Sequence, residues 1–194
     1  MITIRDRKLL GAGAIILLFS IIILQLPLLN YLGYEFSVAV ALIVPFLSAY
    51  LVISGVRSRG AAVEKITASG LRAATSVALG RGFLLLLLPF IAASLNILRV
   101  RNCSYWDGVI FYLLIPCITC FWSVALAGFC VALTGQKVHT RPLATFVLFT
   151  AIVGMVMVYP LYLAYATPQI YSYNFIYGFF PGLSYDEKIG RAHV

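Results

Sequence analysis

The side chains with the greatest capacity for chemistry lie in one short polar segment, residues 99–108, between two long apolar runs. An earlier polar turn, residues 30–35, adds a carboxylate. The group that we expect to meet at one end of the fold is Arg99, Arg101, Asn102, Asp107 and Glu35. Guanidinium groups pair strongly with carboxylate and phosphate oxygens. This polar patch is therefore either an ion-paired cap or a surface that binds an anionic group.

Cys117 and Cys120 stand three residues apart, so a helix would carry both thiols on one face. The spacing resembles that of a metal-binding or redox pair. A structural zinc site, however, needs four ligands, with further Cys or His residues at fixed spacing, and His139 follows the next apolar run, on the opposite side from Cys103. Because thiols in apolar surroundings behave as small hydrophobic side chains, we expect no metal, no cofactor and no catalytic residue.

The elements around these residues are long and apolar. Of the 194 residues, 62% are hydrophobic and 10% are charged, whereas a soluble domain carries about 25% charged residues. About 20 mostly apolar residues cross a bilayer as a helix, and a backbone in lipid must satisfy its own hydrogen bonds. The runs close to this length cover residues 9–29, 37–56, 82–98, 109–133 and 143–165. We predict an all-α, polytopic integral membrane protein with about five transmembrane helices in one domain, residues 1–166.

The net charge of +8 comes from short basic groups beside the apolar runs. No basic stripe follows the chain as nucleic-acid binding would require, so we expect the lipid bilayer, and no nucleic acid, as a partner. On one side of the expected bundle lie Arg5, Arg7, Lys8, Arg57, Arg59, Lys65, Arg72, Arg81, Lys137 and Arg141, against Arg99 and Arg101 on the other side before Lys188. Because Lys and Arg are enriched in cytoplasmic loops, the N-terminus is predicted inside and the C-terminus outside.

Each apolar run contains a proline, which removes a backbone hydrogen bond and tends to kink a helix. These residues are Pro27, Pro45, Pro89, Pro116 and Pro160. Broken helices line the midplane sites of some transporters, although proline is common in membrane helices generally. The runs themselves contain no Asp, Glu, Lys, Arg or His. Since such groups usually mark ion paths and proton relays, the sequence argues against a proton-coupled transporter or an intramembrane protease.

The longest connection, residues 57–81, is basic and carries apolar residues at roughly helical spacing. This pattern predicts a separate helix that lies on the membrane surface. The alternative is a coupling helix that docks on a cytoplasmic partner.

Beyond the last run, aromatic residues alternate within the segment 167–188. They are Tyr171, Tyr173, Phe175, Tyr177 and Phe179. On an extended backbone these side chains would all point the same way. We expect either an extracytoplasmic aromatic ledge on the membrane surface or a strand that leads into an external domain.

Two stretches carry a resemblance: Tyr-Gly-Phe-Phe-Pro-Gly-x-x-Tyr-Asp-Glu at residues 177–187, and Arg-x-Arg-Asn-Cys at residues 99–103. They are similar to segments of uncharacterised bacterial multi-pass membrane proteins. The resemblance implies a membrane fold and assigns no activity and no site residue. The final residues 189–194, Ile-Gly-Arg-Ala-His-Val, look like the translation of a sequencing adapter. We expect them to be an artefact of a truncated gene, whose missing part would begin outside the membrane.

These features predict a multi-pass module of the bacterial cytoplasmic membrane that anchors or assembles with an extracytoplasmic domain. Its partners would be other membrane subunits or the missing C-terminal part of the same chain. Two alternatives stay open: part of a transporter or permease, and the membrane part of an enzyme whose catalytic domain is missing. Further spans with buried charges would favour the transporter, and a nucleophile or metal motif beyond residue 187 would favour the enzyme.

Overall fold

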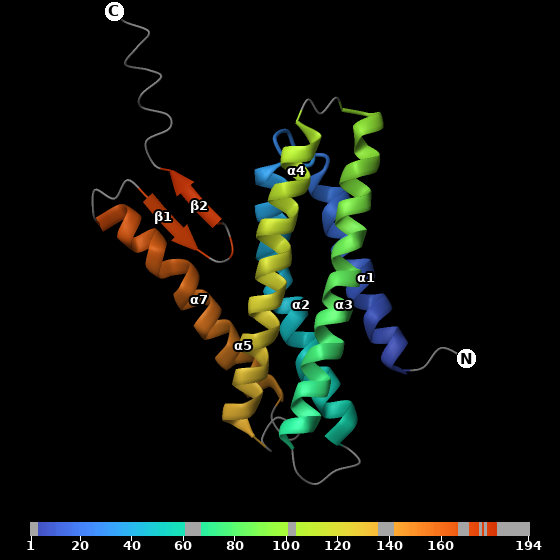
Figure 1. The fold of residues 1–194 in the computed structure, drawn as a ribbon, viewed down its shortest axis with the longest axis vertical. Helices are drawn as coiled ribbons and strands as arrows, with labels where there is room; N and C mark the ends of the chain where they lie inside the picture. Colours follow the sequence, from blue (N-terminus) through green and yellow to red (C-terminus); the bar gives the residue numbers. More distant parts are fainter. Residues whose placement is uncertain are drawn as a thin grey trace, which may run out of the picture.

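The computed structural model describes residues 4–60, 67–100, 104–135, 142–166, 171–174, 176 and 178–181, and helices dominate it (Figure 1). In chain order the elements are α1 (Ile4–Ile23), α2 (Tyr34–Gly60), α3 (Ala68–Leu95), a 3₁₀ turn (Asn96–Leu98), α4 (Tyr105–Tyr112), a π-helical turn (Leu113–Cys117), α5 (Ile118–Thr134), α7 (Pro142–Ala166), β1 (Tyr171–Asn174) and β2 (Gly178–Pro181). From α4 to α5 the chain forms one unbroken helical rod, which we call the α4–α5 rod (Figure 1).

Four helical segments are long and apolar enough to cross a membrane: Tyr34–Ser58, Ala68–Leu98, Tyr105–Thr134 and Pro142–Pro160. The prediction of a helical fold with membrane-length helices is confirmed for these four segments. The first expected span, residues 9–29, is shorter in the structure. Its apolar helical part covers Leu9–Ile23, which is less than the about 20 residues that a bilayer requires.

Pro27 explains why α1 ends at Ile23. A proline at this position has no N–H to donate to the Ile23 carbonyl, and its ring disfavours a helical residue before it. The backbone tightens instead, because the N–H of Leu26 donates to the Ile23 carbonyl three residues back (3.0 Å). The chain then reverses at Leu28, which has a φ of 73°, and the N–H of Leu29 donates to Leu26 O (3.2 Å).

In the described part of residues 57–81 the expected surface helix is not found, because residues 57–60 end α2 and residues 68–81 begin α3. Residues 61–66 lie outside the described part. Thr67 caps α3, since its side-chain oxygen accepts a hydrogen bond from the N–H of Gly70 (3.2 Å). No proline follows until Pro89, so the helix runs on without a break. Residues 68–81, which were expected on the membrane surface, therefore form the first half of a membrane-length helix.

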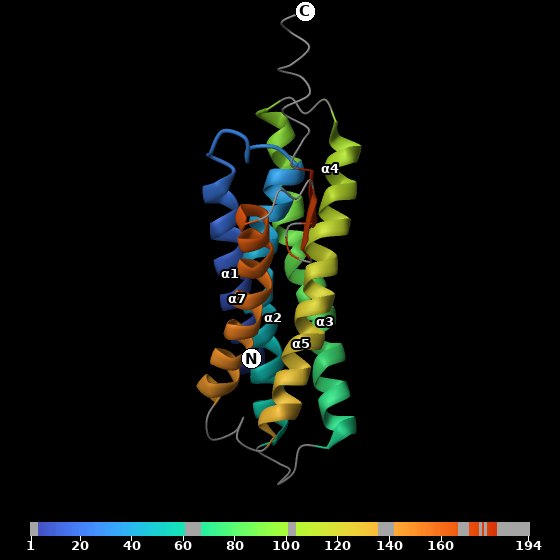
Figure 2. The ribbon, with the colours of Figure 1, turned by 90° about the vertical axis from the view of Figure 1, so that its left-hand side faces the viewer.

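α2 lies at the centre of the bundle, where it contacts α1, α3, α5 and α7. In its most apolar stretch 61% of the residues are buried, against 17% in α7. Figures 1 and 2 show α3 and the α4–α5 rod beside α2, with α7 leaning away from the rod toward its C-terminal end. The fully buried apolar side chains of α2 include Phe36, Val40, Ala41, Ala49 and Val52. The core of the protein is therefore built around this helix.

Glycines allow the helices to approach one another closely. A Cβ atom at Gly82 of α3 would lie 2.6 Å from the Cys120 sulfur of α5. A Cβ atom at Gly128 of α5 would lie 2.9 Å from Cγ2 of Thr75 in α3. Lipid tails are as apolar as the side chains between helices, so helices in a membrane associate through such close packing rather than through the hydrophobic effect. These contacts hold α3 against the rod.

Pro89 of α3 has a polar side chain close by. The hydroxyl of Tyr112, at the end of α4, donates to Leu86 O of α3 (2.8 Å), three residues before the proline. The Tyr112 side chain is buried, so the bond lies inside the bundle. A hydroxyl from a neighbouring helix is one way in which carbonyls in a kinked membrane helix are satisfied.

A hairpin of two antiparallel strands follows α7, with Asn174 of β1 paired with Gly178 of β2. It lies on the side of α7 that faces the rod (Figure 1). The side-chain amide of Asn174 donates to Val156 O of α7 (2.6 Å). Pro160, four residues after Val156, has no N–H to offer this carbonyl. Asn174 therefore replaces the hydrogen bond that the proline removes and joins the hairpin to α7.

The tip of the hairpin is also fixed. The N–H of Ile176 donates to Oδ1 of Asn174 (2.8 Å), and the Ile176 side chain is fully buried. Strand structure is found at residues 171–174 and 178–181, as an antiparallel hairpin rather than as the single extended segment expected. Phe175 and Tyr177 lie outside the described residues.

Candidate functional site

Three polar stretches meet at one end of the bundle, which we call the polar end: the turn between α1 and α2, the turn after α3, and the start of α4 (top of Figure 1). The side-chain amide of Asn96 donates to Asn30 O. Nη1 of Arg99 donates to Oε1 of Gln25 (3.1 Å). Both bonds join residues far apart in the sequence, and they hold the α1–α2 turn against the end of α3.

α4 packs on the same turn and completes the polar end. The space that a Cβ atom would need at Gly108 is occupied by the carbonyl group of Leu32, a buried residue of the α1–α2 turn. The hydroxyls of Ser94 in α3 and Tyr105 in α4 lie 3.0 Å apart, at hydrogen-bond distance. The geometry of this end therefore depends on contacts among three separate stretches of the chain.

Of the five residues predicted to form the polar patch, the structure describes three: Arg99, Asp107 and Glu35. All three are exposed and belong to stretches that meet at the polar end. The two carboxylates lie in the first turns of α4 and α2, where the helix dipole favours negative charge. The partner of Arg99 among the described residues is the Gln25 amide, not a carboxylate. Arg101 and Asn102 lie outside the described residues.

The amides that organise this end were not among the predicted site residues. Gln25 and Asn96 stand near the ends of apolar runs, and an amide in apolar surroundings needs hydrogen-bond partners. An amide side chain within an apolar run was therefore the sequence feature that could have indicated these two residues. The partners themselves, the Asn30 carbonyl and the Arg99 guanidinium, could not be identified, because they depend on how two separate turns fold against each other.

The phenol of Tyr31, in the α1–α2 turn, has a pKa raised above its ordinary value. Partial burial is the main cause, and the Glu35 carboxylate adds to the shift through its charge and through a hydrogen bond. Burial and a nearby negative charge both disfavour the phenolate. The pKa of Tyr31 therefore depends on how closely the α1–α2 turn packs against Glu35 at the start of α2.

We predict that Tyr31 titrates above the ordinary phenol value of about 10, and that Glu35→Gln lowers its pKa without restoring that value, because burial remains. The difference between ultraviolet absorbance titrations of the parent and of Tyr31→Phe isolates the titration of this residue.

The Tyr31 phenol loses its proton at a lower pH in the unfolded chain than in the folded one. The contribution of Tyr31 to stability should therefore fall above about pH 10. Asp107→Asn is the matched control and should leave the titration unchanged. An ordinary pKa for Tyr31 in the parent would contradict this geometry.

The cysteines that the structure describes lie in the apolar part of the bundle. Cys117 is half-buried, Cys120 and Cys130 are buried, and all three are free thiols. The Cys120 sulfur lies 3.9 Å from Oγ of Ser48 in α2 and borders a hollow with room for about one water molecule. Within the described ranges, His, Cys, Asp and Glu form no group of three or more that could hold a metal ion. Cys103 lies outside these ranges.

No protein-family model, curated protein or solved structure matches the chain. Its class therefore rests on the fold. Large apolar side chains point outward from the long helices, for example Leu84 (55% exposed), Phe121 (62%) and Met155 (74%). Extended apolar surface on helices of membrane length is the surface that a bilayer covers. The chain is an integral membrane protein with four long apolar helices.

Proposed function

We propose that the chain is a multi-pass membrane module that anchors, or assembles with, a segment outside the membrane. The observation that carries this proposal is the hydrogen bond between the Asn174 side chain and the Val156 carbonyl (2.6 Å). This bond attaches the chain that leaves α7 to the side of the same helix. A module that holds an external segment needs such a fixed exit point, because a free linker would not set the position of that segment.

The proposed orientation places the N-terminus inside and the C-terminus outside the bacterial cytoplasmic membrane. The distribution of charge supports it. Exposed Arg57 and Arg72 lie at the end of the bundle opposite the polar end, and Lys and Arg near span ends favour the cytoplasm. The polar end, with Glu35 and Asp107, would then face outward.

Thiol labelling tests this orientation. A membrane-impermeant maleimide added to intact cells should label the chain at Cys103, because Cys117, Cys120 and Cys130 lie within a membrane-length apolar segment and are shielded from an aqueous reagent. Cys103→Ser is the matched control and should abolish the labelling. Labelling that requires opened cells would overturn the proposed orientation.

A fusion tests the anchoring function. A reporter enzyme that is active only outside the cytoplasm, fused after Glu187, should be active and should stay with the membranes through an alkaline wash. Asn174→Ala should leave the reporter in the membrane but make the segment that follows α7 more sensitive to added protease. Ser172→Ala, on the same strand, is the control. An inactive reporter, or equal protease sensitivity in both variants, would contradict the proposal.

Part of a transporter or permease is the second candidate. The π-helical turn that contains Pro116 favours it, since such turns often occur at functional sites. Cys120 lies about one helical turn after Pro116 and borders the small hollow described above. A transport path here would expose Cys120 to a water-soluble maleimide. Rapid labelling of Cys120, with Cys103, Cys117 and Cys130 replaced, would favour transport over anchoring.

A further inference from the structure

Arg81 is a charged residue within the membrane-length segment Ala68–Leu98, and its side chain is half-buried. A guanidinium at membrane depth is costly, so it normally pairs with an opposite charge or extends to the membrane surface. Within the part of the chain that the structure describes, no hydrogen bond or ion pair is formed by Arg81. Among the described residues, its charge therefore has no counter-charge.

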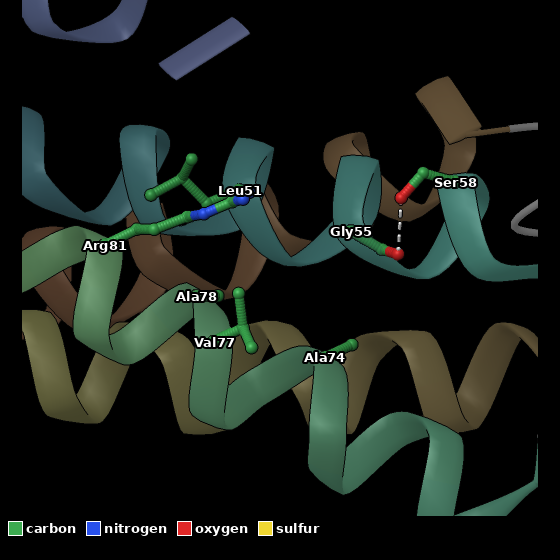
Figure 3. Close-up of a pocket in the computed structure, with 7 residues that line it drawn as sticks. All are labelled: Leu51, Gly55, Ser58, Ala74, Val77, Ala78 and Arg81. Carbon is green, nitrogen blue, oxygen red and sulfur yellow. Dashed lines mark hydrogen bonds between the residues drawn. The ribbon is translucent and has the colours of Figure 1, made fainter. Parts of the chain in front are cut away.

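Arg81 borders a groove between α2 and α3, which we call the α2–α3 groove (Figure 3). Its other lining residues include Leu51, Gly55 and Ser58 of α2, and Ala74 and Ala78 of α3. Figure 3 shows the Arg81 side chain extended across to α2 beside Leu51, in the direction of Gly55. A Cβ atom at Gly55 would meet no atom within 4 Å. The small side chains therefore leave a shallow hollow in the groove, with room for about one water molecule.

The α2–α3 groove lies near one membrane boundary of the bundle. The apolar span of α2 ends at Ser58, so the groove is lined by about the last two turns of that span. The ends of a membrane-spanning helix reach the headgroup layer. Arg57 and Arg72, both exposed, stand at the same end, whereas the carboxylates of Glu35 and Asp107 belong to the polar end. The surroundings of the groove are therefore positively charged.

We propose that the α2–α3 groove binds an anionic phospholipid, with the lipid phosphate at Arg81 and the beginning of an acyl chain against the apolar wall formed by Leu51. The planar fork of a guanidinium matches two phosphate oxygens at once. A zwitterionic lipid also carries a phosphate, but its own positive headgroup lies close to that phosphate and is repelled by Arg81. A lipid with net negative charge is therefore preferred at Arg81.

This inference is independent of the anchoring function, because the groove lies between α2 and α3 while the hairpin is attached to α7. Failure of the fusion experiment would leave it unaffected. Lipid binding also differs from mere extension of the Arg81 side chain to the membrane surface, because binding requires the open space at Gly55 as well as the charge of Arg81.

Native mass spectrometry of the full chain in detergent tests the proposal. The chain is titrated with phosphatidylglycerol or with phosphatidylcholine of the same acyl composition, and bound lipid is counted. The parent should prefer phosphatidylglycerol, and Arg81→Gln should reduce that preference about fivefold, the contribution of one basic residue at a membrane surface. Arg72→Gln removes the same charge from the same helix outside the groove, and should leave the preference nearly unchanged.

A steric variant separates the groove from general charge. Gly55→Leu keeps every basic residue but fills the space at Gly55 in the α2–α3 groove, so it should lower phosphatidylglycerol binding as much as Arg81→Gln does. Gly80→Leu is the matched control, because a Cβ atom at Gly80 also meets no atom within 4 Å and Gly80 does not line the groove. Thermal unfolding in lipid-free detergent checks that each variant is folded. If Arg81→Gln does not fold, the two glycine variants decide the outcome.

Three results would overturn the proposal. Equal effects of Arg81→Gln and Arg72→Gln would mean that the lipid responds to overall charge. An unchanged preference in Gly55→Leu would mean that the groove is not occupied. Displacement of the lipid by excess inorganic phosphate alone would mean that the site recognises free phosphate and not a lipid.

Discussion

Alanine in place of Gly108 is expected to lower the free energy of unfolding by about 1–3 kcal/mol, the usual cost of forcing extra atoms into a packed site. The new Cβ atom would overlap the carbonyl group of Leu32. A backbone carbonyl cannot rotate away as a side chain can, so α4 or the α1–α2 turn would have to move. Reversible unfolding of the purified protein in mixed detergent micelles measures the change.

Gly154→Ala is the matched control for this prediction. Gly154 lies within α7, and a Cβ atom there would meet no atom within 4 Å. Alanine is a better helix former than glycine by about 1 kcal/mol in a helix interior, so the control should be neutral or stabilising. If Gly108→Ala proves as stable as Gly154→Ala, α4 does not pack on the α1–α2 turn as described.

Replacement of Asn174 by alanine should release the hairpin from α7. It removes the bond to Val156 O and the acceptor for the N–H of Ile176. A buried carbonyl left without a partner costs about 1–3 kcal/mol, and Pro160 cannot supply the missing N–H. Hydrogen exchange at the Ile176 amide should accelerate by about one to two orders of magnitude, which is measured by mass spectrometry of the micelle-bound protein.

A double-mutant cycle with Pro160→Ala tests the cause of this effect. An alanine at position 160 restores an N–H that can donate to the Val156 carbonyl within α7. Loss of the Asn174 amide should then cost less than it does in the parent, and the difference is the coupling between the two residues. Equal costs in both backgrounds would show that Asn174 does not compensate for the proline.

The helical class of the protein follows directly from composition, because long uncharged runs have one stable arrangement in lipid. The extent of each helix is harder to predict. In the first run, hydrophobicity continues to Leu29, but the missing N–H of Pro27 ends α1 at Ile23. Here the local backbone chemistry of proline outweighs apolar composition, and a reading based on hydrophobicity alone overestimates the span.

The connection before residue 82 shows the opposite error. Its basic residues and helically spaced apolar residues suggested a surface helix separate from the span that follows. After the Thr67 cap, however, no residue prevents helix propagation before Pro89, and single glycines such as Gly80 cost only about 1 kcal/mol each. Arg72 and Arg81 are accommodated within α3, the first exposed and the second in the α2–α3 groove.

The polar patch was located from the sequence more easily than its contacts were. Polar turns between apolar runs must lie at the ends of the bundle, which is why Arg99 and Glu35 belong to stretches that meet at the polar end. The bond between Arg99 and Gln25 depends on residues 74 positions apart. The same limit applies to Asn174, whose partner Val156 follows from the position of Pro160 only once the hairpin is known to fold back on α7.

The most direct test of the central claim, that a lipid bilayer is the solvent of these helices, is extraction of the expressed chain from cell membranes. The outward-facing apolar side chains of the long helices predict that it stays in the membrane pellet through high salt and alkaline carbonate and is released only by detergent. A chain that is instead monodisperse in plain buffer without detergent would contradict the membrane assignment.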